Sequence, residues 1–406
     1  MAAIQPFRAL RPTPAVAPRV SAVPYDVVDA EEARALAAGN PLSFLHVSRS
    51  EIDLPPATNP YDPEVYRRAR QNFEELARSA PLVDEDEPAL YFYRLRMGDH
   101  QQTGLAACYS IDEYERDLIK KHERTRRDKE DDRTRHLLEL RAQTGVVFLT
   151  YRATAAIDAL AARSCAAAPL FDFTAEDGVQ HSVWRVPEGD LAEVVAAFAA
   201  VPELYIADGH HRAASAARAR AELRSAASPA GTQEFDTVLA VAFPHDQMQI
   251  LPYHRLVKDL GGRPPEAFLA ELKAALPVGE GAARPRGRGE ATMYLGGRWY
   301  ALDLHGGRRA GETAPLDVTL LQERVLEPLL GIADVRTDKR IDFVGGIRGT
   351  GELERAVDSG RAAVAFSMHP VTIDDLIAIA DAGGIMPPKS TWFEPKLRDG
   401  LLIHRI

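Results

Sequence analysis

Residues 204–212 read LYIADGHHR, and this stretch carries most of the information about fold and chemistry. The apolar run that ends at Asp208 predicts a short buried strand, and the alanine-rich run that follows predicts a helix without an intervening linker. The first turn of a helix has unpaired backbone N–H groups and the positive end of the helix dipole, so it favours anions. Because His210, His211 and Arg212 stand at this helix start, we interpret the turn as a phosphate-binding site. The alternative is an ordinary strand–helix joint, with Asp208 as a simple helix cap.

The overall composition restricts the classes of partner. A length of 406 residues predicts more than one domain, and 46% hydrophobic residues allow a large core. The net charge of -10 argues against nucleic acid, because a phosphate backbone is bound by a strongly basic face. The two cysteines have no metal-ligand spacing, residues 1–20 lack a secretory signal, and no stretch approaches the roughly 20 apolar residues of a membrane span. We therefore expect a cytoplasmic protein without a membrane partner.

The order of local patterns indicates the fold class. Helices and strands do not alternate as regular βαβ units, so the sequence favours an α+β fold with mixed sheets, hairpins and packed helices. A shift in composition predicts a phosphate-binding core domain at 1–258 and a C-terminal α+β domain at 259–406. Helices are expected at 30–38, 63–79, 154–168, 191–200, 317–330, 351–359 and 373–382, and from about 128 in the charged stretch; strands are expected at 43–47, 146–151, 236–243, 249–253 and 362–366; hairpins are expected at 89–109, 171–184 and 291–304.

A second candidate segment is rich in charge. Residues 120–133 read KKHERTRRDKEDDR, and all but two of them are charged at neutral pH. His122 and Glu123 are candidates for a general base, and nearby cations are candidates for neutralising a polyphosphate. These cations are Lys121, Arg124 and Arg133. A solvated helix face is the alternative interpretation.

Three shorter motifs add further candidates. Residues 386–391 read MPPKST, and the two prolines restrict the backbone before Lys389. His254 and Arg255 stand at the end of an expected strand, and Tyr25 and Asp26 follow a proline. Local turn architecture is the alternative for each of the three.

Several common enzyme motifs are absent from the sequence. No Gly-x-x-x-x-Gly-Lys-Ser/Thr loop, no Gly-x-Ser-x-Gly elbow and no His-Glu-x-x-His motif occurs. Residues 345–349 read GGIRG but lack the strand–helix context of a dinucleotide site.

These segments together resemble a prokaryotic family known as domain of unknown function 1015. The matching pieces span nearly the whole chain, and the two most specific are residues 207–212 and 386–391. The others are residues 24–27, 40–41, 122–125 with 132–133, and 251–255. Many members begin the first motif with two prolines, whereas this chain has Val23 before Pro24.

The family in turn is similar to the ParB and sulfiredoxin group. In that group a glycine, two polar or charged residues and an arginine open a helix and hold nucleotide phosphates, and Gly209–Arg212 resembles this box. The resemblance therefore implies a ParB/sulfiredoxin-like core with large insertions.

Relatives with this architecture include free-serine kinases, so the resemblance implies a function. It implies a phosphotransferase that phosphorylates the hydroxyl of free L-serine, or of a similar small hydroxyl compound, from pyrophosphate, ADP or ATP with Mg²⁺. The implied proton acceptor is Glu123, Asp208 or His122. The implied phosphate-binding residues are Gly209, His210, His211, Arg212, Lys121, Arg124, Thr125, Arg133, Lys389, Ser390 and Thr391; the implied substrate-binding residues are Tyr25, Asp26, His254 and Arg255.

Two other functions remain open at this point. One is a ParB-like switch that binds a nucleotide and changes its affinity for a partner. The other is a metal-dependent hydrolase built from His122, Glu123, His210 and His211.

Overall fold

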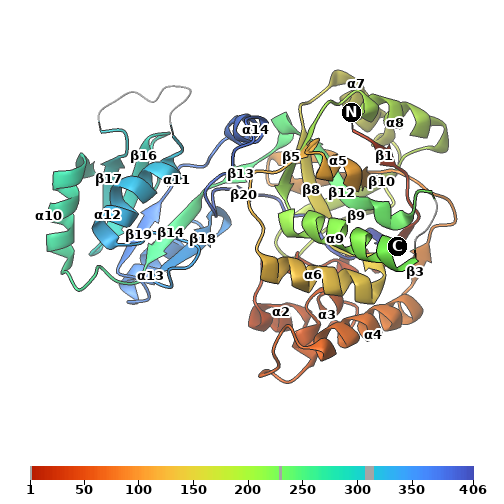
Figure 1. Cartoon of the computed structure of the whole chain (residues 1–406), viewed down its shortest axis with the longest axis horizontal. Coiled ribbons are helices and arrows are strands. Elements are labelled where there is room, and N and C mark those ends of the chain that lie inside the picture. The colour runs from red at the N-terminus through yellow and green to blue at the C-terminus, as the bar shows by residue number, and fades with distance from the viewer. Residues whose placement is uncertain (1, 228–230, 307–314) are drawn as a thin grey trace. The chain divides into compact units, whose positions relative to one another are not determined.

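The computed structural model describes residues 2–227, 231–306 and 315–406. These form two compact units, one from Met1–Met248 with Pro395–Ile406 and one from Gln249–Glu394 (Figure 1). The chain thus divides before the expected boundary at 258, because residues 249–258 make their contacts with the second unit. The C-terminal segment returns to the first unit.

The first unit is built on a mixed sheet of nine strands within the described residues. They are β1 (Ile4–Gln5), β4 (Tyr91–Met97), β5 (His100–Ser110), β6 (Ile119–Lys120), β8 (Val147–Tyr151), β9 (Phe171–Thr174), β10 (Gln180–Arg185), β11 (Leu204–Asp208) and β12 (Thr237–Pro244). The order is β6-β11-β8-β12-β5-β4-β10-β9, and β1 pairs with β5. β8 is parallel to β12 and antiparallel to β11, so the sheet is mixed, as expected from the sequence.

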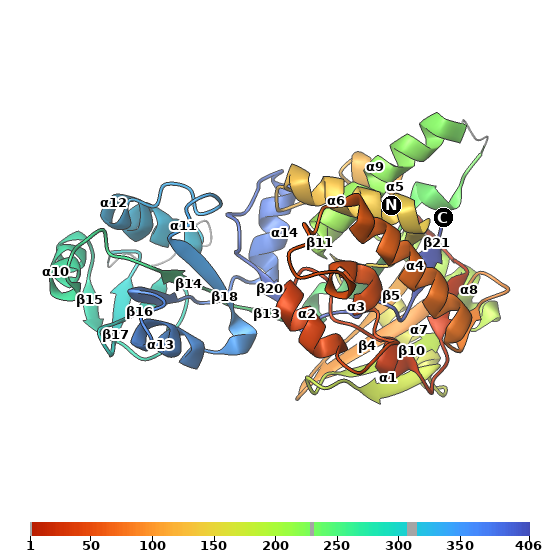
Figure 2. The same cartoon turned by 90° about the horizontal axis from the view of Figure 1, so that it is seen from below.

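Helices cover this sheet and form a second core beside it. They are α1 (Ala17–Val20), α2 (Ala30–Ala37), α3 (Leu45–Ser48), α4 (Pro63–Ser79), α5 (Ile111–Glu115), α6 (Arg127–Leu140), α7 (Ala155–Ser164), α8 (Leu191–Ala199) and α9 (His210–Ala227). α9 packs on β8 and β12, and α6 lies against α9 (Figure 1). α2, α3 and α4 gather into one group, from which α4 contacts α6 (Figure 2).

A small sheet joins the two ends of the first unit. It consists of β2 (Ala9–Pro12), β3 (Leu82–Asp84), β7 (Ala142–Gln143) and β21 (Ile403–Arg405), in the order β3-β2-β21-β7. Just before β21, Asp399 exchanges two backbone hydrogen bonds with Ala22, at 2.9 and 3.1 Å. These bonds hold the C-terminal segment against the part of the chain that comes after β2 in the sequence.

The second unit has its own antiparallel sheet, in the order β15-β17-β16-β19-β14-β18. Its elements are β13 (Ile250–Leu251), β14 (Tyr253–Val257), β15 (Val278–Glu280), β16 (Glu290–Leu295), β17 (Arg298–Asp303), β18 (Ile341–Gly345), β19 (Val364–Ser367), β20 (Trp392–Phe393), α10 (Pro265–Ala275), α11 (Asp317–Leu321), α12 (Glu327–Leu330), α13 (Gly351–Asp358) and α14 (Ile373–Asp381). A π-helical turn, Gln322–Leu326, joins α11 to α12 where one continuous helix was expected.

The expected starts of two helices are confirmed by side chains that cap their first turns. The side chain of Asp29 accepts hydrogen bonds from the first turn of α2 and forms a capping box with Glu32. Asp62 caps α4, and Pro63 occupies its first position. The hairpins β4–β5, β9–β10 and β16–β17 are also where the sequence predicts them.

The expected strand at 43–47 is wrong. Phe44, Leu45 and Val47 are all buried, which is incompatible with one inward and one outward face. The backbone N–H of Ser48 donates to the carbonyl of Phe44 at 2.9 Å, as in a helical turn. Residues 45–48 therefore form α3, whose short apolar pattern alone could not distinguish helix from strand.

The α+β class is confirmed by the mixed sheet of the first unit, the antiparallel sheets and the packed helices. Within the described residues, no helix combines the length and the apolar character needed to cross a lipid bilayer.

The contact between β5 and β12 gives a test of the first unit. A Cβ at Gly104 would lie 2.7 Å from the backbone oxygen of Ala242 and 2.8 Å from the ring of Phe243. Gly104→Ala should therefore lower the free energy of unfolding by about 1–3 kcal/mol, measured by urea titration. Gly189→Ala is the matched control, because no atom lies within 4 Å of its added Cβ. Equal stability of the two variants would contradict the close approach of these strands.

Candidate functional site

The turn between β11 and α9 depends on Gly209. This residue has a φ of 94°, in the left-handed region that favours glycine. A Cβ here would also lie 2.9 Å from Nε of Arg212, because the guanidinium folds back over the turn. Glycine thus permits both the sharp turn and the position of Arg212 at the start of α9.

Arg212 is buried and anchored by three groups. Its Nη1 donates to the carbonyl of Val146 at 2.6 Å, and its Nη2 lies 3.4 Å from Asp208 and 3.7 Å from Asp26. Burial lowers the pKa of Arg212, but the two carboxylates outweigh burial and raise it above its usual range. This side chain is therefore a permanent cation in a fixed orientation.

Asp208 is the carboxylate that terminates β11. Burial raises its pKa, but Lys396, whose Nζ lies 2.9 Å from Oδ2, and Arg212 outweigh burial and hold the pKa of Asp208 well below its usual range. Asp208 consequently stays ionised and orients two cations. It is poorly suited to accept a proton.

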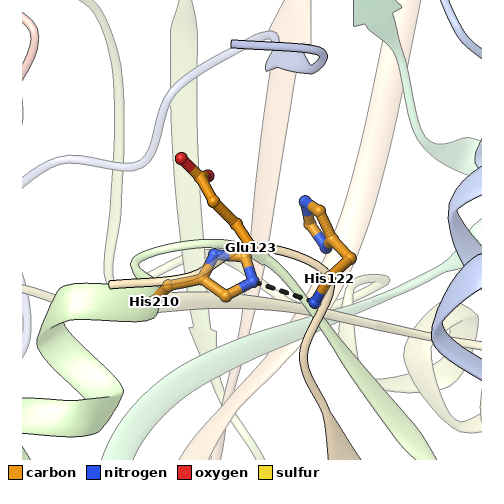
Figure 3. Close-up of side chains that lie close together, drawn as sticks. All are labelled: His122, Glu123 and His210. Carbon is orange, nitrogen blue, oxygen red and sulfur yellow. Dashed lines mark hydrogen bonds between the residues drawn. The ribbon is translucent and has the colours of Figure 1, made fainter. Parts of the chain in front are cut away.

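The two histidines of the turn support the neighbouring loop. Nε2 of His210 accepts a hydrogen bond from the backbone N–H of His122 at 3.4 Å, as Figure 3 shows, and Nε2 of His211 accepts from Arg126 at 3.0 Å. Burial lowers the pKa of both imidazoles, so both are neutral at pH 7. They hold residues 122–126 against the start of α9, while their role in phosphate binding stays a prediction.

The imidazole ring of His122 is buried beside that of His210. Only 2% of the residue is exposed, and within the described part of the chain neither ring nitrogen has a hydrogen-bond partner. Its ring lies edge-on to that of His210, with centroids 4.5 Å apart. Burial lowers the pKa of His122 to about 4, so it is a weak base at neutral pH.

Glu123 completes a cluster that has metal-ligating atoms. One such atom from each of His122, Glu123 and His210 lies within 4.8 Å of the others (Figure 3). Two neutral imidazoles and one carboxylate suit Zn²⁺ or Mn²⁺, whereas Mg²⁺ prefers a shell of oxygen atoms. The cluster therefore does not fit the expected Mg²⁺.

The other charged residues of this segment point in different directions. Nζ of Lys121 donates to the carbonyl of Tyr114 at 2.8 Å and lies 3.3 Å from Asp117, which directs it toward α5. Arg124 is exposed on the loop, and the hydroxyl of Thr125 donates to Glu130. Lys121 is thus engaged away from His122.

Arg133 lies deeper, on α6. Its Nε is 2.8 Å from Asp132, its Nη1 donates to the carbonyl of Ser48 at 3.3 Å, and its guanidinium lies 4.1 Å from the ring centroid of Tyr25. This arrangement brings two predicted site residues, Tyr25 and Arg133, into contact.

A cavity brings these buried groups together. Its free volume is about 40 Å³, which is room for a few water-sized groups, and Arg133 and Arg212 are both in its lining. We call it the Arg133–Arg212 cavity. Its other polar lining residues include Tyr25, Ser48 and Asp399.

Two site residues of the C-terminal segment could not be recognised from the sequence alone. Lys396 pairs with Asp208, and Asp399 lines the Arg133–Arg212 cavity. Burial raises the pKa of Asp399 to about 7, against the opposing effect of Arg212. Residues 395–399 read PKLRD, which has no feature that distinguishes it from a surface turn.

The remaining predicted residues belong to the second unit. His254 is buried and its Nδ1 accepts from the backbone N–H of Met368 at 3.2 Å; burial lowers its pKa to about 4. Burial also lowers the pKa of Arg255 to about 10, and its Nη2 donates to the carbonyl of Lys389 at 3.1 Å.

Arg255 thus anchors the loop of residues 386–391. Lys389 is exposed with a φ of 59°, and its Nζ lies 5.3 Å from the ring centroid of Tyr253. The hydroxyl of Ser390 donates to the carbonyl of Pro387 at 2.6 Å, and Thr391 is half-buried. Roles of Lys389, Ser390 and Thr391 in phosphate binding, and of His254 and Arg255 in substrate binding, stay predictions.

The partly buried pair of Lys396 and Asp208 gives a pH-dependent test. The pKa of Asp208 is depressed in the folded state, so the pair contributes stability above the unfolded value of 3.8, and this contribution is lost as pH falls. Lys396→Met should lower the free energy of unfolding by about 1–3 kcal/mol at pH 7, and the difference from wild type should narrow below about pH 4.

Arg67→Met is the control for this change, because it breaks an exposed pair with Glu64 and should cost less than about 1 kcal/mol. A pH-independent effect of Lys396→Met would contradict the ion pair.

Comparison with solved structures shows similarity at low identity. A conserved hypothetical protein from Pyrococcus furiosus is 13% identical, with a TM-score of 0.37 over 74% of this chain and 95% of that one. SbnI from Staphylococcus aureus, with a C-terminal truncation, is 13% identical, with a TM-score of 0.40 over 74% and 87%. A free serine kinase in complex with AMP is 12% identical, with a TM-score of 0.38 over 73% and 91%. No curated protein sequence matches the chain.

A match to a family model assigns the chain to a protein family. The family described as "Protein of unknown function (DUF1015)" matches residues 4–320, which include the Gly209 turn, the loop at 122–126 and residues 24–27. The chain belongs to the DUF1015 family.

Proposed function

We propose that this protein is a phosphotransferase that phosphorylates the hydroxyl of free L-serine or of a similar small compound. The donor is pyrophosphate or a nucleotide, ADP or ATP. The observation that carries the proposal is the arrangement at the Gly209 turn, where a helix start, Arg212 and the loop with Glu123 lie together. The sequence motifs resemble those of free-serine kinases, and this resemblance is the reason to assign a phosphotransfer reaction to the arrangement.

The start of α9 suits the donor phosphates. Phosphoryl transfer depends mainly on positioning and on stabilisation of charge. The first N–H groups of α9 offer hydrogen bonds, and Arg212 supplies a buried cation whose direction is set by Val146, Asp208 and Asp26. Mg²⁺ bound with the donor would neutralise further charge on its oxygens, without ligation by the histidine cluster.

Glu123 is the proposed proton acceptor. Asp208 is held ionised by two cations, and His122 has a low pKa, which leaves Glu123 as the most suitable of the three candidates. It is half-buried, and the hydrogen bond from His122 to His210 fixes the backbone beside it.

The transfer exchanges one bond to phosphorus for another. The acceptor hydroxyl gives its proton to Glu123, and its oxygen forms a bond to the terminal phosphorus of the donor. The bond from that phosphorus to the bridging oxygen breaks. Orthophosphate leaves from pyrophosphate, AMP from ADP, or ADP from ATP.

Incubation with L-serine, Mg²⁺ and each donor in turn tests the proposal. Phosphoserine, measured by mass spectrometry, should form with at least one donor. Glu123→Gln should lower kcat at least about 100-fold, since the amide cannot accept a proton, and the equal size of the side chain should keep the change in thermal stability small. Glu176→Gln, an exposed carboxylate on the same unit, is the control and should retain full activity.

Absence of phosphoserine with all three donors would overturn the proposal. Full activity of Glu123→Gln would overturn the assignment of the base. Tight nucleotide binding without transfer would instead favour a nucleotide-dependent switch.

A metal-dependent hydrolase is the second candidate, because His122, Glu123 and His210 have the donor atoms of a transition-metal site. Stoichiometric Zn²⁺ or Mn²⁺ in protein purified without added metal, together with hydrolysis of phosphate esters and no transfer to serine, would favour it.

A further inference from the structure

The imidazole of His122 is a buried polar group that the surrounding protein leaves unsatisfied. The residue is 2% exposed, and among the residues that the structure describes neither Nδ1 nor Nε2 makes a hydrogen bond. A buried donor or acceptor without a partner is destabilising, so native structures usually satisfy such a group with water, a ligand or an ion. The ring of His122 therefore indicates an occupant that is not part of the chain.

Two neighbouring side chains offer lone pairs at the same place. One ligand atom from each of His122, Glu123 and His210 lies within 4.8 Å of the other two (Figure 3). Donor atoms bound to one tetrahedral Zn²⁺ lie about 3.4 Å apart, as follows from bonds of about 2.1 Å. Small side-chain rotations are enough to bring the three atoms to these positions.

The two imidazoles are in a state that suits metal binding. Both are neutral, so neither has to lose an extra proton before it binds a metal ion. Nε2 of His210 accepts only a long hydrogen bond, 3.4 Å, from the backbone N–H of His122. Because this distance is at the outer limit for a hydrogen bond, its loss costs little.

The charges around the cluster favour a dication. Glu123 contributes one carboxylate, and Asp208 is near enough to raise the pKa of His122 and of His210, although burial outweighs it. The two nitrogen donors select a transition-metal ion such as Zn²⁺ over Mg²⁺, which prefers oxygen atoms. Three protein ligands leave the fourth position of a tetrahedral ion to water.

We propose that His122, Glu123 and His210 bind Zn²⁺ and that the bound ion inhibits phosphate transfer. The inhibition rests on the proposed function, in which Glu123 is the proton acceptor. A carboxylate that binds a dication is a much weaker base, so Glu123 no longer takes the proton from the acceptor hydroxyl. Binding of the ion, by contrast, does not depend on any transfer reaction.

This role is the opposite of the one that the ion has in a hydrolase. A catalytic Zn²⁺ lowers the pKa of its bound water and raises turnover. An inhibitory Zn²⁺ removes the base and lowers turnover. The direction in which Zn²⁺ changes the rate therefore distinguishes the two.

Calorimetric titration of the metal-free, full-length protein with ZnCl₂ tests the site. One Zn²⁺ should bind per chain, also in the presence of excess Mg²⁺, and CoCl₂ should give the visible absorption of four-coordinate Co²⁺. His122→Phe retains a buried ring without nitrogen and should weaken Zn²⁺ binding at least about tenfold. Glu123→Gln, which retains the size of the side chain, should also weaken it. His100→Phe changes a half-buried histidine on β5 and is the control, with unchanged affinity.

The rate of phosphoserine formation tests the inhibition. With Mg²⁺ in excess, one equivalent of Zn²⁺ should lower the rate of the wild-type protein at least about tenfold, and EDTA followed by fresh Mg²⁺ should restore it. Each variant is compared with itself, with and without Zn²⁺. The His122→Phe protein should have the same rate in both conditions, whereas His100→Phe should be inhibited like the wild type.

The outcomes separate this inference from the proposed function. Zn²⁺ binding that depends on His122 and Glu123, without transfer from any donor, would support the metal site and remove the phosphotransferase. Transfer at full rate with one Zn²⁺ bound would support the phosphotransferase and overturn the inhibition. Hydrolysis of phosphate esters that rises with bound Zn²⁺ would also overturn it and favour the hydrolase. Equal affinity of the wild type and both cluster variants for Zn²⁺ would overturn the site.

Discussion

The candidate site depends on the buried guanidinium of Arg212. It folds back over Gly209, pairs with Asp208 and Asp26, and donates to the carbonyl of Val146. A buried charge is tolerated only when it is paired and hydrogen-bonded, so these partners are constraints on the fold as well as on the site. This one side chain fixes the relative positions of three segments, which are the end of β11, the start of α9 and the residues before β8. The same side chain lines the cavity with Asp399.

The two neutral histidines of the turn hold the neighbouring loop in place. His210 and His211 accept hydrogen bonds from the backbone of the loop that contains His122 and Glu123. Burial keeps both imidazoles uncharged, which is the state in which Nε2 can accept. A sequence of adjacent basic residues therefore does not mean adjacent positive charges. Here the arginine supplies charge, and the histidines supply position.

The sequence predicts those features that depend on local chemistry. The glycine turn, the caps at Asp29 and Asp62 and the hairpins all follow from neighbouring residues. The helix at 45–48 does not, because a short apolar run fits either state until its packing against α4 is known. Lys396 and Asp399 could not be found from their surroundings in sequence, since their role arises from contacts with residues such as Asp208 and Arg212 far along the chain.

Hydrogen–deuterium exchange with pyrophosphate and Mg²⁺ tests most directly whether the Gly209 turn binds phosphate. The account predicts slower exchange at the backbone N–H groups of residues 209–212 and of the loop at 122–126, with the same region unprotected in Arg212→Lys. Unchanged exchange there in the wild-type protein, at a concentration of pyrophosphate that protects another region, would contradict it.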